Sequence, residues 1–315
     1  MGIFMHSISG VIIILGLIIV GYVLAARGWF PGTTDKLLAR LVTQIALPCY
    51  MIQTITSRFS AHQMLTMVPD LVFPVLSMMI LMVISLIVIR VFKVDPSHQG
   101  LFASMFFNSN TVFVGLPINQ ALFGDKSIPF VLIYYMANTT IFWTIGTYFI
   151  QKDGAKAVDF SWKKTLGKIF SPPLLGFIVG VLLVLAQVKL PLFLAKDFQY
   201  LGNLTTPLSM LFIGICIYRA GLKQLTLHKD NWLILLGRFV IAPLVLALLL
   251  LPTHLPVLMK QVFIMQAAMP VMTNAPVVAR LYDADADYAS VMVTETTFLS
   301  LLVVPILMIL TQGIG

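Results

Sequence analysis

The sequence predicts an all-α polytopic membrane protein whose ten transmembrane helices form two inverted five-helix repeats, with broken, crossing fourth and ninth helices. Three observations lead to this prediction. The chain is 59% hydrophobic and 10% charged, whereas soluble domains carry roughly 25% charged residues. Ten apolar runs of about 20 residues, each long enough to cross the hydrocarbon core, follow one another along the chain. A single shift of 159 residues lays the first half on the second.

Short polar connections separate the apolar runs. The runs cover residues 7–27, 36–56, 68–91, 98–123, 128–150, 166–186, 198–218, 231–251, 257–282 and 288–310. The longest polar connection, residues 151–164, is interpreted as a cytoplasmic linker between a first repeat (1–150) and a second repeat (165–315).

The two halves match at prolines inside their apolar runs. The shift sets Pro48 on Pro207, and Pro117 on Pro276. Because each half contains an odd number of runs, the second half enters the membrane from the opposite side, which makes the repeat inverted. Paired segments interrupted by Gly or Pro at corresponding positions of such halves indicate a transporter's binding site near the membrane midplane.

Lys and Arg side chains are concentrated in the connections on one side of the predicted membrane. The connections after runs one, three, five, seven and nine carry fourteen of them, and the other side carries five. Because cytoplasmic loops are enriched in Lys and Arg, both termini are predicted on the outer side of the bilayer. The net charge of +8 is dispersed among the connections, and therefore does not indicate nucleic-acid binding, which requires basic residues gathered on one face.

The sequence contains no motif for catalysis or metal binding. It has no Walker loop, no HExxH and no GxSxG, so neither an enzyme nor an ATP-driven pump is expected. Cys49 and Cys216 stand alone in apolar runs and are interpreted as small buried hydrophobes. The run of Asp283, Asp285 and Asp287 lacks the Gly and closing Glu of an EF-hand, and is interpreted as a solvated turn.

The fourth run is interrupted by polar residues that a membrane-spanning helix does not favour. The residues at this interruption are Asn108, Ser109, Asn110 and Thr111, followed by Gly115 and Pro117. Polar groups at membrane depth are tolerated where they are buried in protein or line a watery cavity, so the stretch is interpreted as a site. For Asn108 and Asn110 the alternative is a structural role. We expect Gly115 and Pro117 to shape the half-helix.

The ninth run carries the corresponding interruption. Pro270 and Pro276 flank Thr273 and Asn274, and each proline removes a backbone donor and disfavours a regular helix. If the two broken helices cross, the N-termini of their half-helices converge and supply a positive field suited to a carboxylate.

Polar residues in the fifth and tenth runs are further candidates. Asn138 lies in an apolar surround, where interhelical hydrogen bonding is the alternative to a functional role. Glu295 is the only carboxylate well inside an apolar run, and an isolated carboxylate at that depth is suited to carrying a proton. Two alternatives stay open for Glu295: a static pair with Arg238 or Arg280, and exposure near the cytoplasmic mouth.

The interrupted runs carry two specific motifs. The stretch NTVFVGLP at residues 110–117, followed by ALFGD at 121–125, resembles the NTxxxGxP…YG signature of the auxin efflux carrier superfamily, which contains plant PIN auxin exporters and bacterial malate or malonate permeases. QAAMP at 266–270 is similar to its ninth-span motif QAALP. Leu47-Pro48 resembles its second-span proline, and NTTIFWT at 138–144 is similar to its fifth-span run QCIIWYT.

The resemblance implies a scaffold of spans one, two, six and seven, and a mobile transport domain of the other six spans. It implies alternating access for small organic anions by an elevator-like slide, and a homodimer through the scaffold helices is the expected assembly. By this resemblance Asn110 contacts the substrate, Asn138 lies near its carboxylate and Leu47 forms the scaffold wall. Ser109 replaces the crossover proline of plant members, and Asn138 is shorter than the family's Gln; the short linker favours a bacterial member.

The expected function is secondary transport of small organic carboxylates across the cell's inner (plasma) membrane, without a cofactor or a metal. The residues expected to bind the anion are Leu47, Asn110, Thr111, Asn138, Met269, Pro270 and Asn274. A malate-like dicarboxylate and an auxin-like monocarboxylate both stay open, although a dicarboxylate ordinarily needs a cation, and none is evident in the predicted site. The alternatives are a sodium- or proton-coupled carrier of the bile-acid symporter type and, outside transporters, an anion channel.

Overall fold

The structure, a computed structural model, describes residues 2–62, 68–154, 170, 172–220 and 228–312. Within these residues the chain is helical and forms no strand, apart from one isolated antiparallel bridge between Ser109 and Val271. The prediction of an all-α protein is therefore confirmed. Most of the predicted linker, residues 151–164, lies outside the described residues.

The helices follow the apolar runs of the sequence. In the first half they are α1 (Gly2–Ala26), α2 (Thr34–Leu41), η1 (Val42–Ala46), α3 (Leu47–Arg58), η2 (Val68–Leu71), α5 (Val72–Phe92), η3 (Pro96–His98), α6 (Gln99–Phe107), η4 (Thr111–Gly115), α7 (Leu116–Phe123), η5 (Asp125–Ser127), α8 (Ile128–Ile141), η6 (Phe142–Gly146) and α9 (Thr147–Asp153). In the second half they are α11 (Pro172–Leu185), α12 (Leu192–Asn203), α13 (Thr205–Ala220), α14 (Lys229–Leu236), η8 (Gly237–Ile241), α15 (Ala242–Leu250), α16 (Val257–Ala267), α17 (Ala275–Leu281) and α18 (Ala286–Gln312).

Three prolines inside helical segments follow short π-helical turns. The turns η1, η4 and η8 end two residues before Pro48, Pro117 and Pro243 respectively. A proline removes one helical hydrogen bond and its ring collides with the carbonyl one turn earlier, and a wider turn relieves that collision. The step at Pro117, which the sequence marks as unfavourable for a regular helix, thus lies within one helical segment, Thr111–Phe123.

Five helical segments of the described chain are long and apolar enough to cross a membrane: Pro69–Phe92, Asp125–Asp153, Leu192–Arg219, Lys229–Leu250 and Ala286–Thr311. Shorter apolar helices accompany them, including Thr111–Phe123 and Val257–Ala267 of the interrupted runs. Large apolar side chains are exposed on the outer faces of these helices, for example Ile87, Leu248 and Ile306. A helix that is apolar on its outer face as well as its inner face is typical of a membrane span, so the chain is a polytopic membrane protein.

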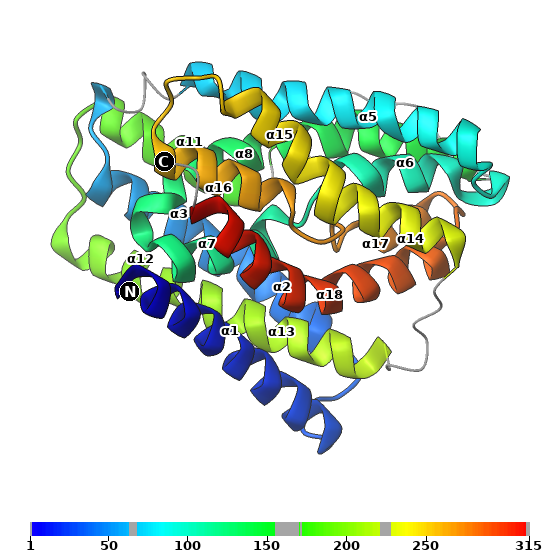
Figure 1. The fold of residues 1–315 in the computed structure, drawn as a ribbon. Coiled ribbons are helices and arrows are strands. Elements are labelled where there is room, and N and C mark those ends of the chain that lie inside the picture. Colours follow the sequence, from blue (N-terminus) through cyan, green and yellow to red (C-terminus); the bar gives the residue numbers. More distant parts are fainter. Residues whose placement is uncertain (1, 63–67, 155–169, 171, 221–227, 313–315) are drawn as a thin grey trace.

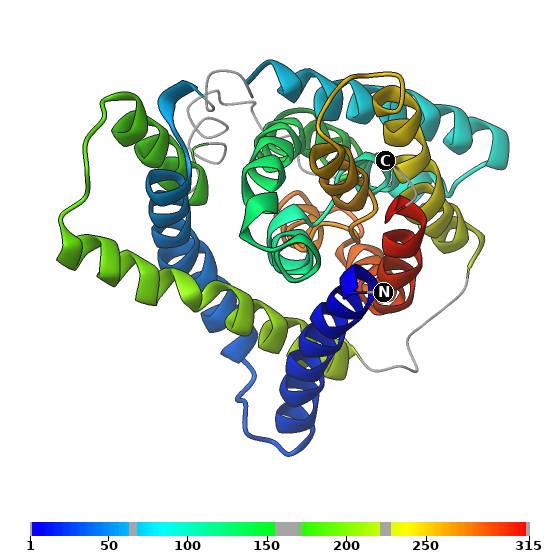
Figure 2. The same ribbon diagram turned by 60° about the vertical axis from the view of Figure 1, so that its left-hand side comes forward.

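The buried apolar side chains form two clusters. One cluster joins α5, α6, α8 and α14–α18. The other joins α1, α3, α11 and α13 with the α7 region and the neighbouring faces of α8 and α16. Figure 2 shows α1, α3 and α11–α13 as a layer to one side of the remaining helices. In this layer Gly21 of α1 lies against the main chain of Leu211, and the missing side chain lets the two helix backbones approach closely.

The N-terminus of α6 is held by the end of α9. Asp153 accepts hydrogen bonds from the main-chain nitrogens of Gly100 (2.8 Å) and Leu101 (2.6 Å), which satisfies donors that an α-helix leaves free in its first turn. The next residue, Gly154, lies against the main chain of Tyr282, just beyond α17. The start of α6 and the end of α17 therefore lie on the same side of the molecule.

Candidate functional site

The two interrupted runs meet at their breaks. The first break, residues 108–110, separates α6 from the helix that begins at Thr111, and the second, residues 268–274, separates α16 from α17. Ser109 pairs with Val271 in the antiparallel bridge, and the nitrogen of Asn110 donates to the carbonyl of Pro270 at 2.8 Å. In Figure 1 both interrupted segments run between α5 and α15 on one side and α1 and α13 on the other.

One amide of α8 holds the first break. The Asn138 side chain donates to the Ser109 carbonyl (2.8 Å) and accepts from the Ser109 nitrogen (3.0 Å). It also accepts from Nδ2 of Asn108 at 3.3 Å. A buried main-chain group without a partner costs about 1–3 kcal/mol, and Asn138 removes two such costs at once.

The second break is held by a hydroxyl and a guanidinium. Oγ1 of Thr296 in α18 accepts from the Val271 nitrogen at 3.1 Å. Arg238 of η8 is fully buried and donates to the carbonyls of Phe106 (3.0 Å) and Met269 (3.0 and 3.1 Å), and to that of Ala267. Arg238 thus binds the ends of both α6 and α16.

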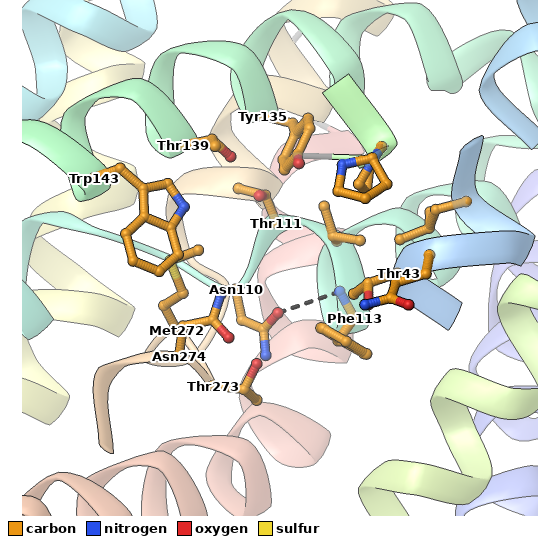
Figure 3. Close-up of a pocket in the computed structure, with 15 residues that line it drawn as sticks. Thr43, Asn110, Thr111, Phe113, Tyr135, Thr139, Trp143, Met272, Thr273 and Asn274 are labelled. Carbon is orange, nitrogen blue, oxygen red and sulfur yellow. Dashed lines mark hydrogen bonds between the residues drawn. The ribbon is translucent and has the colours of Figure 1, made fainter. Parts of the chain in front are cut away.

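A cavity of about 230 Å³ lies beside the crossover. Its lining residues are Thr43, Gln44, Leu47, Asn110, Thr111, Val112, Phe113, Tyr135, Thr139, Trp143, Pro172, Pro173, Met272, Thr273 and Asn274. Figure 3 shows Tyr135 and Thr139 on one side and Asn110, Thr273 and Asn274 on the other. None of these lining residues carries a formal charge, and the cavity is bounded by both buried clusters.

Two buried donors in the cavity lining have no hydrogen-bond partner among the described residues: Nδ2 of Asn110 and Oγ1 of Thr139. The Asn110 amide is oriented by its other end, because Oδ1 caps the helix by accepting from the nitrogen of Phe113 at 3.2 Å. The positive end of the helix Thr111–Phe123 lies at the same place. The cavity therefore offers neutral donors and a helix N-terminus to a ligand that accepts hydrogen bonds.

The predicted anion-binding residues divide into two groups. Leu47, Asn110, Thr111 and Asn274 line the cavity. Asn138, Met269 and Pro270 do not line it and hold the crossover instead, through the hydrogen bonds of the Asn138 side chain and of the Met269 and Pro270 carbonyls.

The remaining predicted crossover residues lie at helix contacts. Gly115 faces the side-chain amide of Gln266, which leaves no room for a Cβ atom there. Nε2 of Gln266 donates to the carbonyl of Thr111 at 3.4 Å, and Pro276 lies in the first turn of α17. Gly115 and Gln266, one from each motif, therefore lie at the contact between the two broken helices.

Sequence reasoning missed one face of the continuous helix α8–η6 as a wall of the cavity. Tyr135, Thr139 and Trp143 follow one another at intervals of four residues and all line it. Residues four apart lie on the same helix face, and this spacing was the available signal. Asn138 lies one residue from that row and points to the crossover instead.

Glu295 is buried, with 2% of its surface exposed, and accepts from Nδ2 of Asn231 at 2.9 Å. The predicted exposure near the cytoplasmic mouth is therefore wrong. The two arginines suggested as its partners lie elsewhere: Arg238 binds the main-chain carbonyls described above, and Arg280 lies 3.5 Å from Asp287.

Comparison with known proteins gives concordant matches over nearly the whole chain. Residues 6–308 match the family model described as "Membrane transport protein". An "uncharacterized transporter" of Methanocaldococcus jannaschii is 27% identical over 303 residues, covering 93% of this chain and 95% of that protein. An "uncharacterized transporter" of Methanothermobacter thermautotrophicus is 26% identical over 309 residues, covering 96% and 98%.

Proposed function

The chain belongs to the membrane transport protein family, the auxin efflux carrier-like family that its motifs resemble, and from this premise we propose that it is a secondary transporter of small organic monocarboxylates. The observation that carries the proposal is the neutral cavity at the crossover, with the unpartnered Nδ2 of Asn110 in its wall. One carboxylate would accept from Asn110 and Thr139, with an apolar body against Leu47, Tyr135 and Trp143.

The size of the cavity favours a small anion, and the lack of charge in its lining favours a monoanion over a dicarboxylate. The cavity of about 230 Å³ is smaller than the roughly 300–1,000 Å³ of pockets for drug-sized ligands. Burial of a carboxylate without a compensating partner is strongly unfavourable. A second carboxylate would meet no basic side chain among the lining residues, so a malate-like substrate is the weaker candidate.

The proposed mechanism is alternating access by an elevator-like slide of one helical layer against the other. Its support is the composition of the cavity wall, where Leu47 belongs to the layer of α1, α3 and α11–α13, and Asn110 and Asn274 belong to the broken helices. A slide between these layers would open the cavity to either side in turn.

Inverted repeats would supply two related states for this motion. The helix bounds support them, because α7 and α17 begin at Leu116 and Ala275, 159 residues apart. Both termini are proposed to lie outside the plasma membrane, as the distribution of Lys and Arg indicates.

The homodimer is likewise proposed to form through the layer of α1, α3 and α11–α13. The helix α12 exposes Leu192, Phe193 and Tyr200, and these side chains would face either lipid or the second subunit. Light scattering measures the mass of the purified protein in solution. Comparing the unaltered protein with variants in which these α12 side chains are replaced would decide between the two environments.

Counterflow in proteoliposomes tests the proposed function. Vesicles loaded with unlabelled indole-3-acetate, a monocarboxylate, should take up the labelled compound saturably, whereas malate-loaded vesicles should show little exchange of labelled malate. Asn110→Ala should reduce this flux by about 10- to 100-fold, since a hydrogen bond to a charged group contributes about 1.5–3 kcal/mol. Asn110→Ser keeps a helix-capping oxygen and should fail similarly, and Asn203→Ala on the exposed end of α12 serves as the control.

The outcomes separate the alternatives. Flux without saturation and without counterflow would identify an anion channel. Full activity of the folded Asn110→Ala protein would refute the assignment of the cavity. Faster exchange of malate than of indole-3-acetate would reverse the choice of substrate class.

A further inference from the structure

Arg238 is a buried cation at the centre of the crossover. Its side chain has 0% of its surface exposed, and within the described residues its hydrogen bonds all go to main-chain carbonyls. These carbonyls belong to Phe106, near the end of α6, and to Ala267 and Met269, at and just beyond the end of α16. One guanidinium therefore joins the C-terminal ends of both half-helices.

The C-terminal end of a helix attracts a cation. Its last carbonyls lack helical partners and carry the negative end of the helix dipole. In transporters with discontinuous helices, such carbonyls coordinate the coupling sodium ion or proton. A guanidinium remains protonated in proteins and presents five donors in a rigid fork, so it can satisfy the same carbonyls without a bound ion.

The local structure of α14 and η8 brings the guanidinium to this position. The residue before it, Gly237, faces the ring of Phe106 so closely that a Cβ atom would not fit. The π turn η8 spans Gly237–Ile241, and such turns reorient side chains at functional sites. The approach of this helix to α6 thus depends on a glycine and a widened turn, both next to Arg238.

We propose that Arg238 is a tethered cation that takes the place of a coupling metal ion at the half-helix C-termini, so that the carrier works without sodium. Within the described part of the chain, no group of three or more His, Cys, Asp or Glu side chains is placed to hold a metal ion. The prediction that transport is independent of sodium rests on the proposed function. The binding of the carbonyls by Arg238 does not rest on it.

Thermal unfolding of the purified protein tests this assignment without any substrate. At constant ionic strength, the Tm of the unaltered protein should be the same in sodium, potassium and choline chloride. Arg238→Ala exposes the carbonyls and should lower the Tm by on the order of 10 °C. Millimolar methylguanidinium or sodium should restore part of that loss, and neither should raise the Tm of the unaltered protein.

Arg280→Ala is the matched control, because Arg280 has a side chain 77% exposed, and its Tm should not respond to these ions. If Arg238→Ala does not fold, Arg238→Lys keeps the charge with fewer donors and should give a lower Tm that remains independent of sodium. In proteoliposomes, counterflow of the unaltered protein should be equal in sodium and choline.

Three results would overturn the proposal. These are a saturable rise of the unaltered protein's Tm or counterflow with sodium, an Arg238→Ala protein of unchanged Tm, and a loss of Tm that no cation relieves, which would make Arg238 a purely structural residue. A protein that transports no tested anion but has a sodium-independent Tm and a cation-rescued Arg238→Ala variant would contradict only the proposed function.

Discussion

The two breaks at the crossover present the same difficulty and are stabilised differently. Each leaves main-chain donors and acceptors at membrane depth, where water is not available to satisfy them. In the first break one amide, Asn138, satisfies both groups of Ser109. In the longer second break the Thr296 hydroxyl satisfies Val271, and Arg238 satisfies carbonyls at its beginning.

The two breaks also contribute different groups to the cavity and the crossover. The first break is compact, and its last residue, Asn110, lines the cavity and carries a buried donor that has no hydrogen-bond partner among the described residues. The second break contributes Thr273 and Asn274 to the cavity, while the carbonyls at its beginning surround a fixed positive charge. In the proposed transporter the first half thus supplies the main donor for the substrate, and the second half supplies the buried Arg238.

The largest effect is expected for Asn138→Leu, which removes the support of the first break. Two main-chain groups of Ser109 would lose their partner in a buried position, at a cost of about 1–3 kcal/mol each. We expect a loss of roughly 2–6 kcal/mol in the free energy of unfolding, measured by denaturant titration in detergent. A stable Asn138→Leu protein would show that the first break holds its shape without the amide. That result would contradict the stabilisation of the first break by Asn138.

A smaller loss is expected for Gly115→Ala, which tests the contact between the two breaks. The new methyl group would displace the side-chain amide of Gln266 from the Thr111 carbonyl. Overpacking of this kind costs about 1–3 kcal/mol, measured as a lower Tm. The double variant Gly115→Ala, Gln266→Ala should recover part of the loss, and a double variant less stable than either single one would contradict this contact.

A still smaller loss is expected for Thr296→Val, the counterpart of Asn138→Leu in the second half. Valine keeps the shape of threonine but leaves the Val271 nitrogen without its acceptor, at a cost of about 1–2 kcal/mol. Denaturant titration should therefore rank Thr296→Val clearly below Asn138→Leu. Equal losses of stability in the two variants would mean that Thr296 stabilises the second break as strongly as Asn138 stabilises the first. Arg238 would then contribute little to the second break.

The smallest effect on stability is expected for Glu295→Gln, which tests the proposed proton carrier. The glutamine oxygen can still accept from Asn231, so the Tm should stay close to that of the unaltered protein. The residue 159 positions earlier is the apolar Met136, so the first half has no carboxylate at the corresponding position. Transport measured across a range of pH should lose its pH dependence, and an unchanged profile would leave Glu295 a structural residue.

The sequence located the crossover but not the orientation of every side chain around it. The polar interruption at residues 108–111 and the prolines near Asn274 predicted both breaks, since polar groups at membrane depth require burial or a cavity. The cavity wall of Tyr135, Thr139 and Trp143 was missed, because which face of α8 meets the crossover depends on packing between distant helices. From the sequence, Arg238 was considered only as a partner of Glu295. Its partners in the structure are main-chain carbonyls, which every residue carries, so no sequence pattern indicates them.

The unequal lengths of the half-helices have an electrical consequence. At 1.5 Å per residue, α6 and α17, whose outer ends lie on one side, span about 14 and 10 Å, whereas the helix Thr111–Phe123 and α16 span about 20 and 16 Å toward the other side. If the outer ends of these helices mark the two faces of the membrane, the crossover divides the membrane field unequally. In the proposed transporter, a monoanion that enters from the side of α6 and α17 would then cross the smaller part of that field before it binds. Of the roughly 2.3 kcal/mol per 100 mV that a full crossing involves, most then belongs to the passage on the far side. In this conformation, the membrane potential should act mainly on that passage.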